Sequence, residues 1–378
     1  MIQNQIPLSF PQIEREEKEA VLRVLESGWL AHGEYNQKLE EDFARFIGVK
    51  HAITMNSCTS ALELSIKVHG ITGEVIIPSF SFVATANAVV NAGAKPVFCD
   101  VDIETRNVTA KHIESCITPN SKAVIVVHYG GQPCAMDDII ALCEKYRLLL
   151  IEDSAETIGA TWRGKQTGSF GIGCFSFFPT KNMTTGEGGI VACNDDSVAQ
   201  KIRALISHGI SSTTFAREKA EKPWFRSAIM AGHNFRMSNI LAAIGYYQFK
   251  KLDKMNHERQ CLAKYYDNGI KEYSLPVKIP EVQEGATHVY QMYTVRVMKH
   301  NNRDAWVHEL WKNGVGASVH FDPPIHLQQF YREHYLVKCP LPNTELLAKN
   351  LITLPMYPSL SKQKLDQVLD IMKKVMVK

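Results

Sequence analysis

The sequence predicts an α/β protein: a large domain built on a seven-stranded, mostly parallel sheet, followed by a smaller C-terminal α/β domain. The chain has 378 residues, and a chain of this length usually folds around more than a single hydrophobic core. Short apolar segments alternate with helical patterns from residue 51 to 193, as in a parallel sheet covered on both faces. The pattern then changes, so we predict a large domain of residues 1–250, whose N-terminal residues can pack on the small domain, and a small domain of residues 251–378.

Seven segments have the length and composition of buried strands, and two helices precede them. Helical spacing of apolar residues predicts helices over Glu14–Ser27 and Asn36–Ile47, each followed by a glycine. The last two strands are joined by too few residues for a helical crossover, so one of them is expected to be antiparallel. The predicted strands are His51–Met55, Glu74–Ile77, Pro96–Asp100, Lys122–Val127, Leu148–Glu152, Gly173–Phe178 and Gly189–Cys193.

In the small domain, three further elements are predicted. The apolar segment His288–Met298 is expected to form a strand and Arg303–Asn313 a helix. A closing amphipathic helix is expected to begin after Ser361, which has the side chain of a helix cap.

The composition excludes several classes of protein. The formal net charge of +3 gives no strong field, so no nucleic acid partner is implied. The nine cysteines are scattered without a C-x-x-C pair, and no secretory signal opens the chain, which predicts a cytoplasmic protein. No apolar run approaches the ~20 residues that cross a bilayer.

Two motifs, LLLIEDSAE and FSFFPTKNMTTGEGG, carry the chemistry. The first reads as a strand that ends on Glu152 and Asp153, and carboxylates at strand ends face the ligand crevice of an open α/β sheet. The second reads as a strand that stops at Pro179 and places Lys181 in a loop before a cluster of glycines. We therefore expect an aspartate and a lysine at neighbouring strand ends.

Pyridoxal phosphate (PLP) is the cofactor that needs both residues. Its aldehyde bonds to a lysine amine, here Lys181, and its ring nitrogen needs an acidic partner, here Asp153, to stay protonated. Taken singly, the aspartate is more simply a helix cap and the lysine a surface charge. Their pairing within one glycine-punctuated frame favours the cofactor.

Through EDSAE, FSFFPTKN and TTGEGG the chain resembles the DegT/DnrJ/EryC1/StrS family of sugar-nucleotide aminotransferases, over nearly its whole length. The resemblance implies PLP fold type I and transamination, and it is perosamine-synthase-like because those members share the glutamate found here at position 156. The relatives that instead remove a sugar hydroxyl replace the lysine with histidine. This chain keeps Lys181, which favours transamination.

A cluster of hydroxyl residues follows the first strand and opens a helix, at Asn56–Ser60. A helix N-terminus of this kind is either an anion site or a plain N-cap. Similarity to the family's NSGTAAL motif favours phosphate binding by Ser57, Cys58 and Thr59, although the family usually has glycine or alanine in place of Cys58. Ser176 matches the family's phosphate-contacting position.

The resemblance implies three more cofactor contacts. Phe82 matches the aromatic residue over the pyridine ring, whereas composition alone favours a core residue. Glu156 stands where most of the family has a glutamine that hydrogen-bonds the phenolic oxygen. Asn234, in GHNFRMSN, matches a segment that reaches the phosphate of the neighbouring subunit, so a homodimer with shared active sites is implied.

Three residues are candidates for substrate binding: Trp29 in the SGWL turn, and His320 and His326 in HFDPPIH. The latter stretch resembles HYPPPLH, which lies near the nucleotide-sugar in relatives, but two such histidines are equally compatible with an exposed loop. No metal site is expected, because no third ligand completes a recognisable spacing.

Transfer of the amino group of L-glutamate to a nucleotide-linked keto-sugar, a 4-keto-6-deoxyhexose, is the function implied, in the synthesis of lipopolysaccharide O-antigen or another surface glycan. A 3-keto sugar nucleotide and an oxidised octulosonate are alternative acceptors. A regulator that binds PLP or a sugar nucleotide without catalysis is the alternative of another class.

Overall fold

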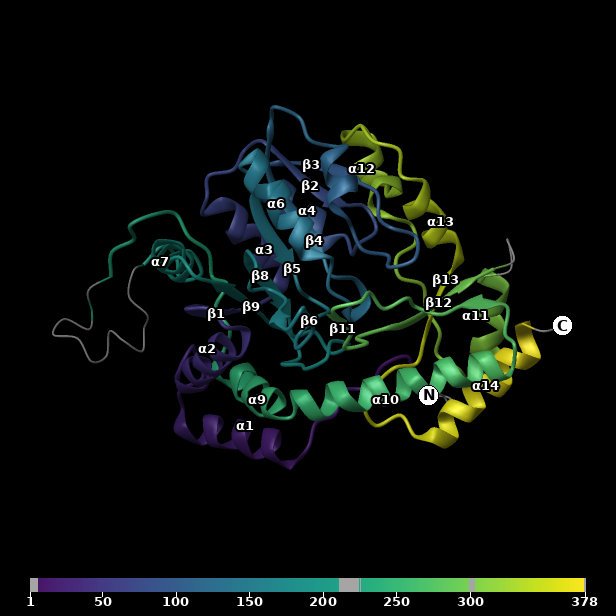
Figure 1. Ribbon diagram of the computed structural model, residues 1–378. Coiled ribbons are helices and arrows are strands. Elements are labelled where there is room, and N and C mark those ends of the chain that lie inside the picture. Colours follow the sequence, from purple (N-terminus) through teal and green to yellow (C-terminus); the bar gives the residue numbers. More distant parts are fainter. Residues whose placement is uncertain (1–5, 211–223, 225, 299–302, 377–378) are drawn as a thin grey trace.

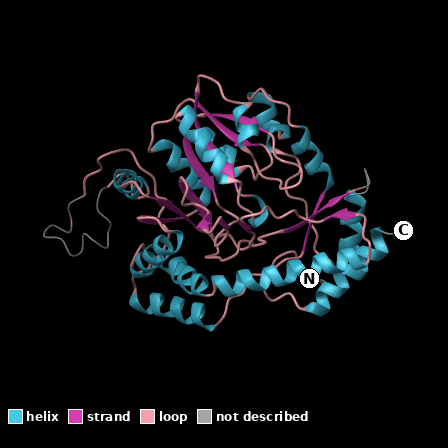
Figure 2. Ribbon diagram, in the orientation of Figure 1, coloured by secondary structure: helices cyan, strands magenta, loops and turns pink. Residues whose placement is uncertain are grey.

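The computed structural model describes residues 6–210, 224, 226–298 and 303–376. Figure 1 shows a large central sheet among helices, with a second small sheet beside it. The long helix α10 (Leu252–Glu272) runs from the helices near the first sheet to those of the second. Figure 2 shows the helices on either side of the main sheet.

The main sheet has seven strands in the order β1-β9-β8-β5-β4-β2-β3. Strand β9 is antiparallel to both of its neighbours, and the other pairs are parallel. The mostly parallel sheet with one reversed strand is therefore confirmed. Its strands are β1 (His51–Met55), β2 (Glu74–Pro78), β3 (Lys95–Cys99), β4 (Ser121–Val127), β5 (Leu149–Asp153), β8 (Ile172–Ser176) and β9 (Gly189–Cys193).

Helices cover both faces of this sheet because successive strand residues point to opposite sides. Ile77 and Ile151 pack in one cluster with helices α3 (Cys58–Lys67), α4 (Ala84–Asn91) and α7 (Asp196–Leu205). Their neighbours Ile76 and Leu150 pack in another cluster with α5 (Ala110–Glu114) and α6 (Met136–Tyr146).

The two predicted N-terminal helices form as α1 (Arg15–Ser27) and α2 (Glu34–Ile47). Both end at glycines in the left-handed conformation, with φ of 70° at Gly28 and 81° at Gly48. They pack against α9 (Asn239–Lys250) beside the edge of the main sheet, where β1 and β9 lie.

The second sheet has the order β10-β12-β13, and α10 and two further helices pack on it. Ile6 belongs to the same cluster and pairs with Val315 in an isolated bridge. The 250/251 boundary itself stays a prediction. The new elements are β10 (Val277–Lys278), β12 (Tyr293–Val297), β13 (Leu351–Leu354), α11 (Arg303–Lys312) and α14 (Lys362–Met376).

The predicted strand His288–Met298 is wrong in its first half. Residues 288–292 are irregular, and regular pairing begins only at Tyr293. The reason is that the backbone N–H groups of Val289 and Met292 donate to a glycine turn of the large domain instead of to a strand. Helices α12 (Gln329–His334) and α13 (Pro342–Asn350) were not predicted.

Smaller features complete the structure. A third sheet joins β11 (Ala286–Thr287), β6 (Thr161–Trp162) and β7 (Lys165–Gln166). A disulfide joins Cys116 to Cys339, 223 positions apart in sequence, a pairing that the scattered cysteines did not suggest. In the part of the chain that the structure describes, every helix is too short or too polar to span a bilayer.

Candidate active site

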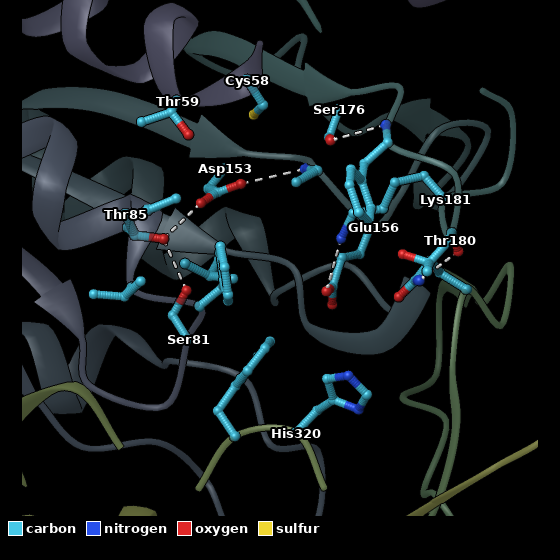
Figure 3. Close-up of a pocket in the computed structure, with 18 of the residues that line it drawn as sticks. Cys58, Thr59, Ser81, Thr85, Asp153, Glu156, Ser176, Thr180, Lys181 and His320 are labelled. Carbon is cyan, nitrogen blue, oxygen red and sulfur yellow. Dashed lines mark hydrogen bonds and ion pairs between the residues drawn. The ribbon is translucent and has the colours of Figure 1, made fainter. Parts of the chain in front are cut away.

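A cavity of about 640 Å³ opens at the carboxyl ends of the central strands. Figure 3 shows side chains from several elements converging on it, with Asp153 and Lys181 on neighbouring walls. The C-terminal part of the chain closes one side. Its lining includes Ser57, Cys58, Thr59, Phe82, Thr85, Asp153, Glu156, Ser176, Lys181, Gln291, His320 and Phe321.

Asp153 is the last residue of β5 and is 6% exposed. One carboxylate oxygen accepts a hydrogen bond from the Thr85 hydroxyl at 2.7 Å and the other from the Ala155 N–H at 3.3 Å. Burial raises the pKa of Asp153, and these two hydrogen bonds offset only part of that effect. Asp153 forms no ion pair with another described residue, so the carboxylate is placed to receive a cationic group from a ligand.

Lys181 lies in the loop that follows β8, where a turn from the Phe178 carbonyl to the Lys181 N–H, 2.9 Å long, fixes the backbone. Its Nζ lies 3.2 Å from Glu156 Oε1. The second Glu156 oxygen accepts from the Gly130 N–H at 2.7 Å. The lysine amine is thus held at one end of the cavity by a carboxylate that is itself anchored.

Glu152 does not face the cavity, contrary to the expectation for both strand-end carboxylates. Adjacent strand residues point to opposite faces, so only Asp153 can line it. Glu152 is fully buried and accepts from the N–H groups of Gly168, Phe170 and Gly171. His128 Nε2 lies 3.1 Å away, so this carboxylate is committed to the fold.

The start of α3 forms one wall of the cavity. Ser57 is its N-cap and accepts from the Ser60 N–H at 3.1 Å, so the capping interpretation is correct. Capping by Ser57 is compatible with anion binding, because the first N–H groups of a helix have no intrahelical partner. Cys58 and Thr59, which carry such groups, line the cavity.

The helix start can approach the sheet because β9 begins with glycine. A Cβ atom on Gly189 would lie 2.5 Å from both Cys58 N and Ser57 C. Burial raises the pKa of the Cys58 thiol well above its usual value, so the thiol is neutral. Ser176, at the end of β8, adds a hydroxyl to the same cavity.

Phe82 lies at the cavity mouth and is 61% exposed, so it is not a core residue. Its ring centroid is 6.2 Å from that of Phe321, which comes from the C-terminal part of the chain. The two rings are tilted by 47° to one another and give the cavity mouth an apolar, aromatic edge.

The structure separates the two histidines of HFDPPIH. His320 lines the cavity, and its Nδ1 contacts the Thr353 hydroxyl at 2.8 Å, which leaves Nε2 for a ligand. Burial lowers the pKa of His320, which favours the neutral ring. His326 is buried against Ser79, 2.7 Å from its hydroxyl, and does not line the cavity.

Two other predicted residues also lie outside the lining of this cavity. Trp29 donates from Nε1 to the His32 carbonyl at 3.0 Å. Asn234 is exposed and forms an isolated backbone bridge with Ser207. Neither residue reaches the cavity of its own chain.

Sequence reasoning missed Thr85 and Gln291. Thr85 lies three residues beyond Phe82, near the start of α4, and a threonine at such a place gives no distinct signal. Gln291 gave a usable signal, since it is a polar residue inside a segment taken for an apolar strand.

The arrangement fits PLP. The unpaired buried carboxylate of Asp153 suits a protonated ring nitrogen, the Lys181 amine suits an aldehyde, and the start of α3 suits a phosphate. No group of three or more histidine, cysteine or acidic side chains within the described residues is arranged to hold a metal ion.

Known proteins share this architecture. The model of the DegT/DnrJ/EryC1/StrS aminotransferase family matches residues 11–373. The spore coat polysaccharide biosynthesis protein SpsC of Bacillus subtilis is 37% identical over 374 residues, which cover 97% of this chain and 95% of SpsC.

Solved structures agree. The aminotransferase TlmJ from Streptoalloteichus hindustanus is 32% identical with a TM-score of 0.91, covering 98% of this chain and 99% of its own. The PLP-form of Spr1654 from Streptococcus pneumoniae, a putative sugar aminotransferase, is 26% identical with a TM-score of 0.91 and covers 99% of both chains. The chain therefore belongs to the DegT/DnrJ/EryC1/StrS aminotransferase family and is a PLP-dependent aminotransferase of fold type I.

Proposed function

We propose that this enzyme transfers the amino group of L-glutamate to the ketone of a nucleotide-linked 4-keto-6-deoxyhexose in the cytoplasm, for a surface polysaccharide such as an O-antigen. The observation that carries the proposal is one cavity in which Asp153 and the Lys181–Glu156 pair converge. A sugar acceptor is supported by the similarity to SpsC, a spore coat polysaccharide biosynthesis protein, and to the sugar aminotransferase Spr1654.

Each residue has a defined task. PLP, when bound, supplies the carbonyl carbon that takes up the amino group and the ring that accepts electrons. Asp153 keeps a positive charge on the ring nitrogen, and Lys181 Nζ, once released, moves a proton to and from the substrate carbon. Glu156 Oε1 orients that amine, and the start of α3 with Ser176 binds the phosphate.

A homodimer with shared sites is part of the proposal. Among the described residues that line the cavity, Lys181 is the only lysine or arginine. The cofactor phosphate, a dicarboxylate donor and a nucleotide diphosphate together need more donors than one chain offers. Asn234 is exposed and does not line the cavity of its own chain, which suits a contact with the phosphate in a partner.

His320 is the substrate contact that the geometry favours. Its neutral ring lies across the cavity from Lys181 in Figure 3 and suits a hydroxyl or carbonyl of the acceptor. Trp29 and His326 remain proposals that would require a partner chain or a rearrangement.

The test combines labelling with a substrate panel. Borohydride reduction of the PLP-loaded enzyme should fix the pyridoxyl group on Lys181, because this lysine alone lies in the strand-loop-glycine frame, and peptide mapping checks it. Glutamate and a panel of keto-sugars, including 3-keto sugar nucleotides and an oxidised octulosonate, should yield one aminated product by mass spectrometry.

Lys181→Ala should abolish amination while leaving the melting temperature nearly unchanged. A label on another lysine would refute the assignment. PLP binding without amination of any acceptor would instead support the regulator.

A further inference from the structure

Residues 288–292, hereafter the 288–292 segment, hold both neighbours of Lys181. The Gln291 amide nitrogen donates to the Thr180 carbonyl at 2.9 Å. On the other side, the Asn182 amide nitrogen donates to the Val289 carbonyl at 3.2 Å. The loop that presents the lysine is thus fixed from a segment more than a hundred residues further along the chain.

The same segment also holds the glycine turn that anchors Glu156. The Met292 N–H donates to the Gly130 carbonyl at 3.2 Å, and the Val289 N–H donates to the Gly131 carbonyl at 2.9 Å. Gly130 in turn donates to Glu156 at 2.7 Å. The 288–292 segment therefore positions both partners of the Lys181–Glu156 pair.

Helix α10 keeps this piece of backbone in place. Arg259 is 2% exposed, and its guanidinium contacts the carbonyls of Tyr290 and Gln291 at 3.4 and 3.3 Å. Gln260 donates to the His288 carbonyl at 3.0 Å. Gln260 is thus a second glutamine that holds the segment, but it does not line the cavity.

Within the part of the chain that the structure describes, only one end of the Gln291 side-chain amide forms a hydrogen bond: the nitrogen has a partner and the oxygen has none. A carbonyl only accepts, so the amide nitrogen must face Thr180, and the assignment of the two amide atoms is fixed. Gln291 is 5% exposed, and its Oε1 has no partner among the described residues. A buried unpaired acceptor costs about 1–3 kcal/mol. An apolar side chain of similar length would avoid this cost, so stability alone does not account for a glutamine here.

We infer that Gln291 is a positioning residue for Lys181: it holds the Thr180 carbonyl so that the lysine amine stays aligned with Glu156 and with the reacting carbon. The inference rests on the proposed role of Lys181. Misplacement of a reacting group by about 1 Å can cost on the order of a hundredfold in rate, whereas substrate affinity depends on other walls of the cavity.

The test is Gln291→Met in the full-length, PLP-loaded enzyme, since methionine keeps the length and removes both polar atoms. We expect kcat to fall about tenfold or more while KM for glutamate and for the acceptor changes less than about threefold. The melting temperature of the cofactor-free variant should be unchanged or higher, because the unpaired acceptor is gone. Gln260→Met is the matched control and should keep kcat within about threefold of wild type.

Three outcomes would overturn the inference. A wild-type kcat in Gln291→Met would show that catalysis does not depend on the hydrogen bond between Gln291 and the Thr180 carbonyl. Equal losses of kcat in both variants, with parallel drops in melting temperature, would show only that the segment needs its anchors. An active Lys181→Ala enzyme would remove the proposed function first and this inference with it, whereas an inactive Lys181→Ala beside an active Gln291→Met would remove this inference alone.

Discussion

At the scale of single residues, Asp153 links stability to catalysis. Its pKa is raised by burial, so the cofactor-free protein loses stability as the pH rises through the titration of this carboxyl. Asp153→Asn keeps the shape and removes the charge. We expect the melting temperature of the cofactor-free variant to rise by about 1 to 3 °C at neutral pH, and kcat of the loaded enzyme to fall at least about tenfold.

Calorimetry across pH checks the first part. The difference in melting temperature between wild type and Asp153→Asn should shrink in acid, where the wild-type carboxyl is also neutral. A variant with wild-type kcat would mean that Asp153 does not face the cofactor ring.

The placement of a site residue was predictable from the sequence where a single local motif contains all the information needed. Asp153 ends β5, Lys181 lies in the loop that follows β8, and both line the cavity. The failures have physical causes: strand alternation turns Glu152 away, and a bond to Ser79 on a distant strand end draws His326 into the interior. Gln291 stood out as a polar residue in an apolar segment, but its contact with Thr180 was not predictable because the two residues lie far apart in the sequence.

At the scale of elements, the contact between β9 and α3 sets the position of the proposed phosphate site. Gly189→Ala would place a methyl group 2.5 Å from the backbone of α3, so the helix start must move. We expect PLP affinity to fall at least about tenfold, measured by equilibrium titration of cofactor-free protein. Ile190→Val, on the same strand, should cost only about 0.5–1.5 kcal/mol of stability and leave PLP affinity unchanged.

Unchanged PLP affinity in Gly189→Ala would show that the start of α3 does not bind the phosphate.

The strands of the main sheet were predictable because each is a short apolar run between helical patterns. The segment 288–292 was not, since its N–H groups pair with a glycine turn, a choice that only the folded chain reveals.

At the scale of the whole molecule, the proposed shared site makes a prediction about mixtures. Lys181→Ala and an Asn234→Glu variant should each be inactive, the second because a negative charge repels the phosphate. If Asn234 serves the partner, refolding the two together gives heterodimers in which both lesions fall in one site and the other is intact. Activity should then reappear, as measured by amination of the acceptor. Heterodimers without activity would place Asn234 in its own subunit or outside the site.

Among the described strands, β1 pairs only with β9. This pairing has a consequence for biosynthesis. The ribosome releases β1 early, yet its hydrogen-bonding partner emerges only after five other strands of the main sheet. Until then the first strand has no partner among the described strands of the sheet, and the start of α3 lacks the glycine of β9 against which its backbone packs. A nascent chain halted before β9 would therefore present Asp153 and Lys181 without a settled phosphate site, and cofactor capture must follow the arrival of this one reversed strand.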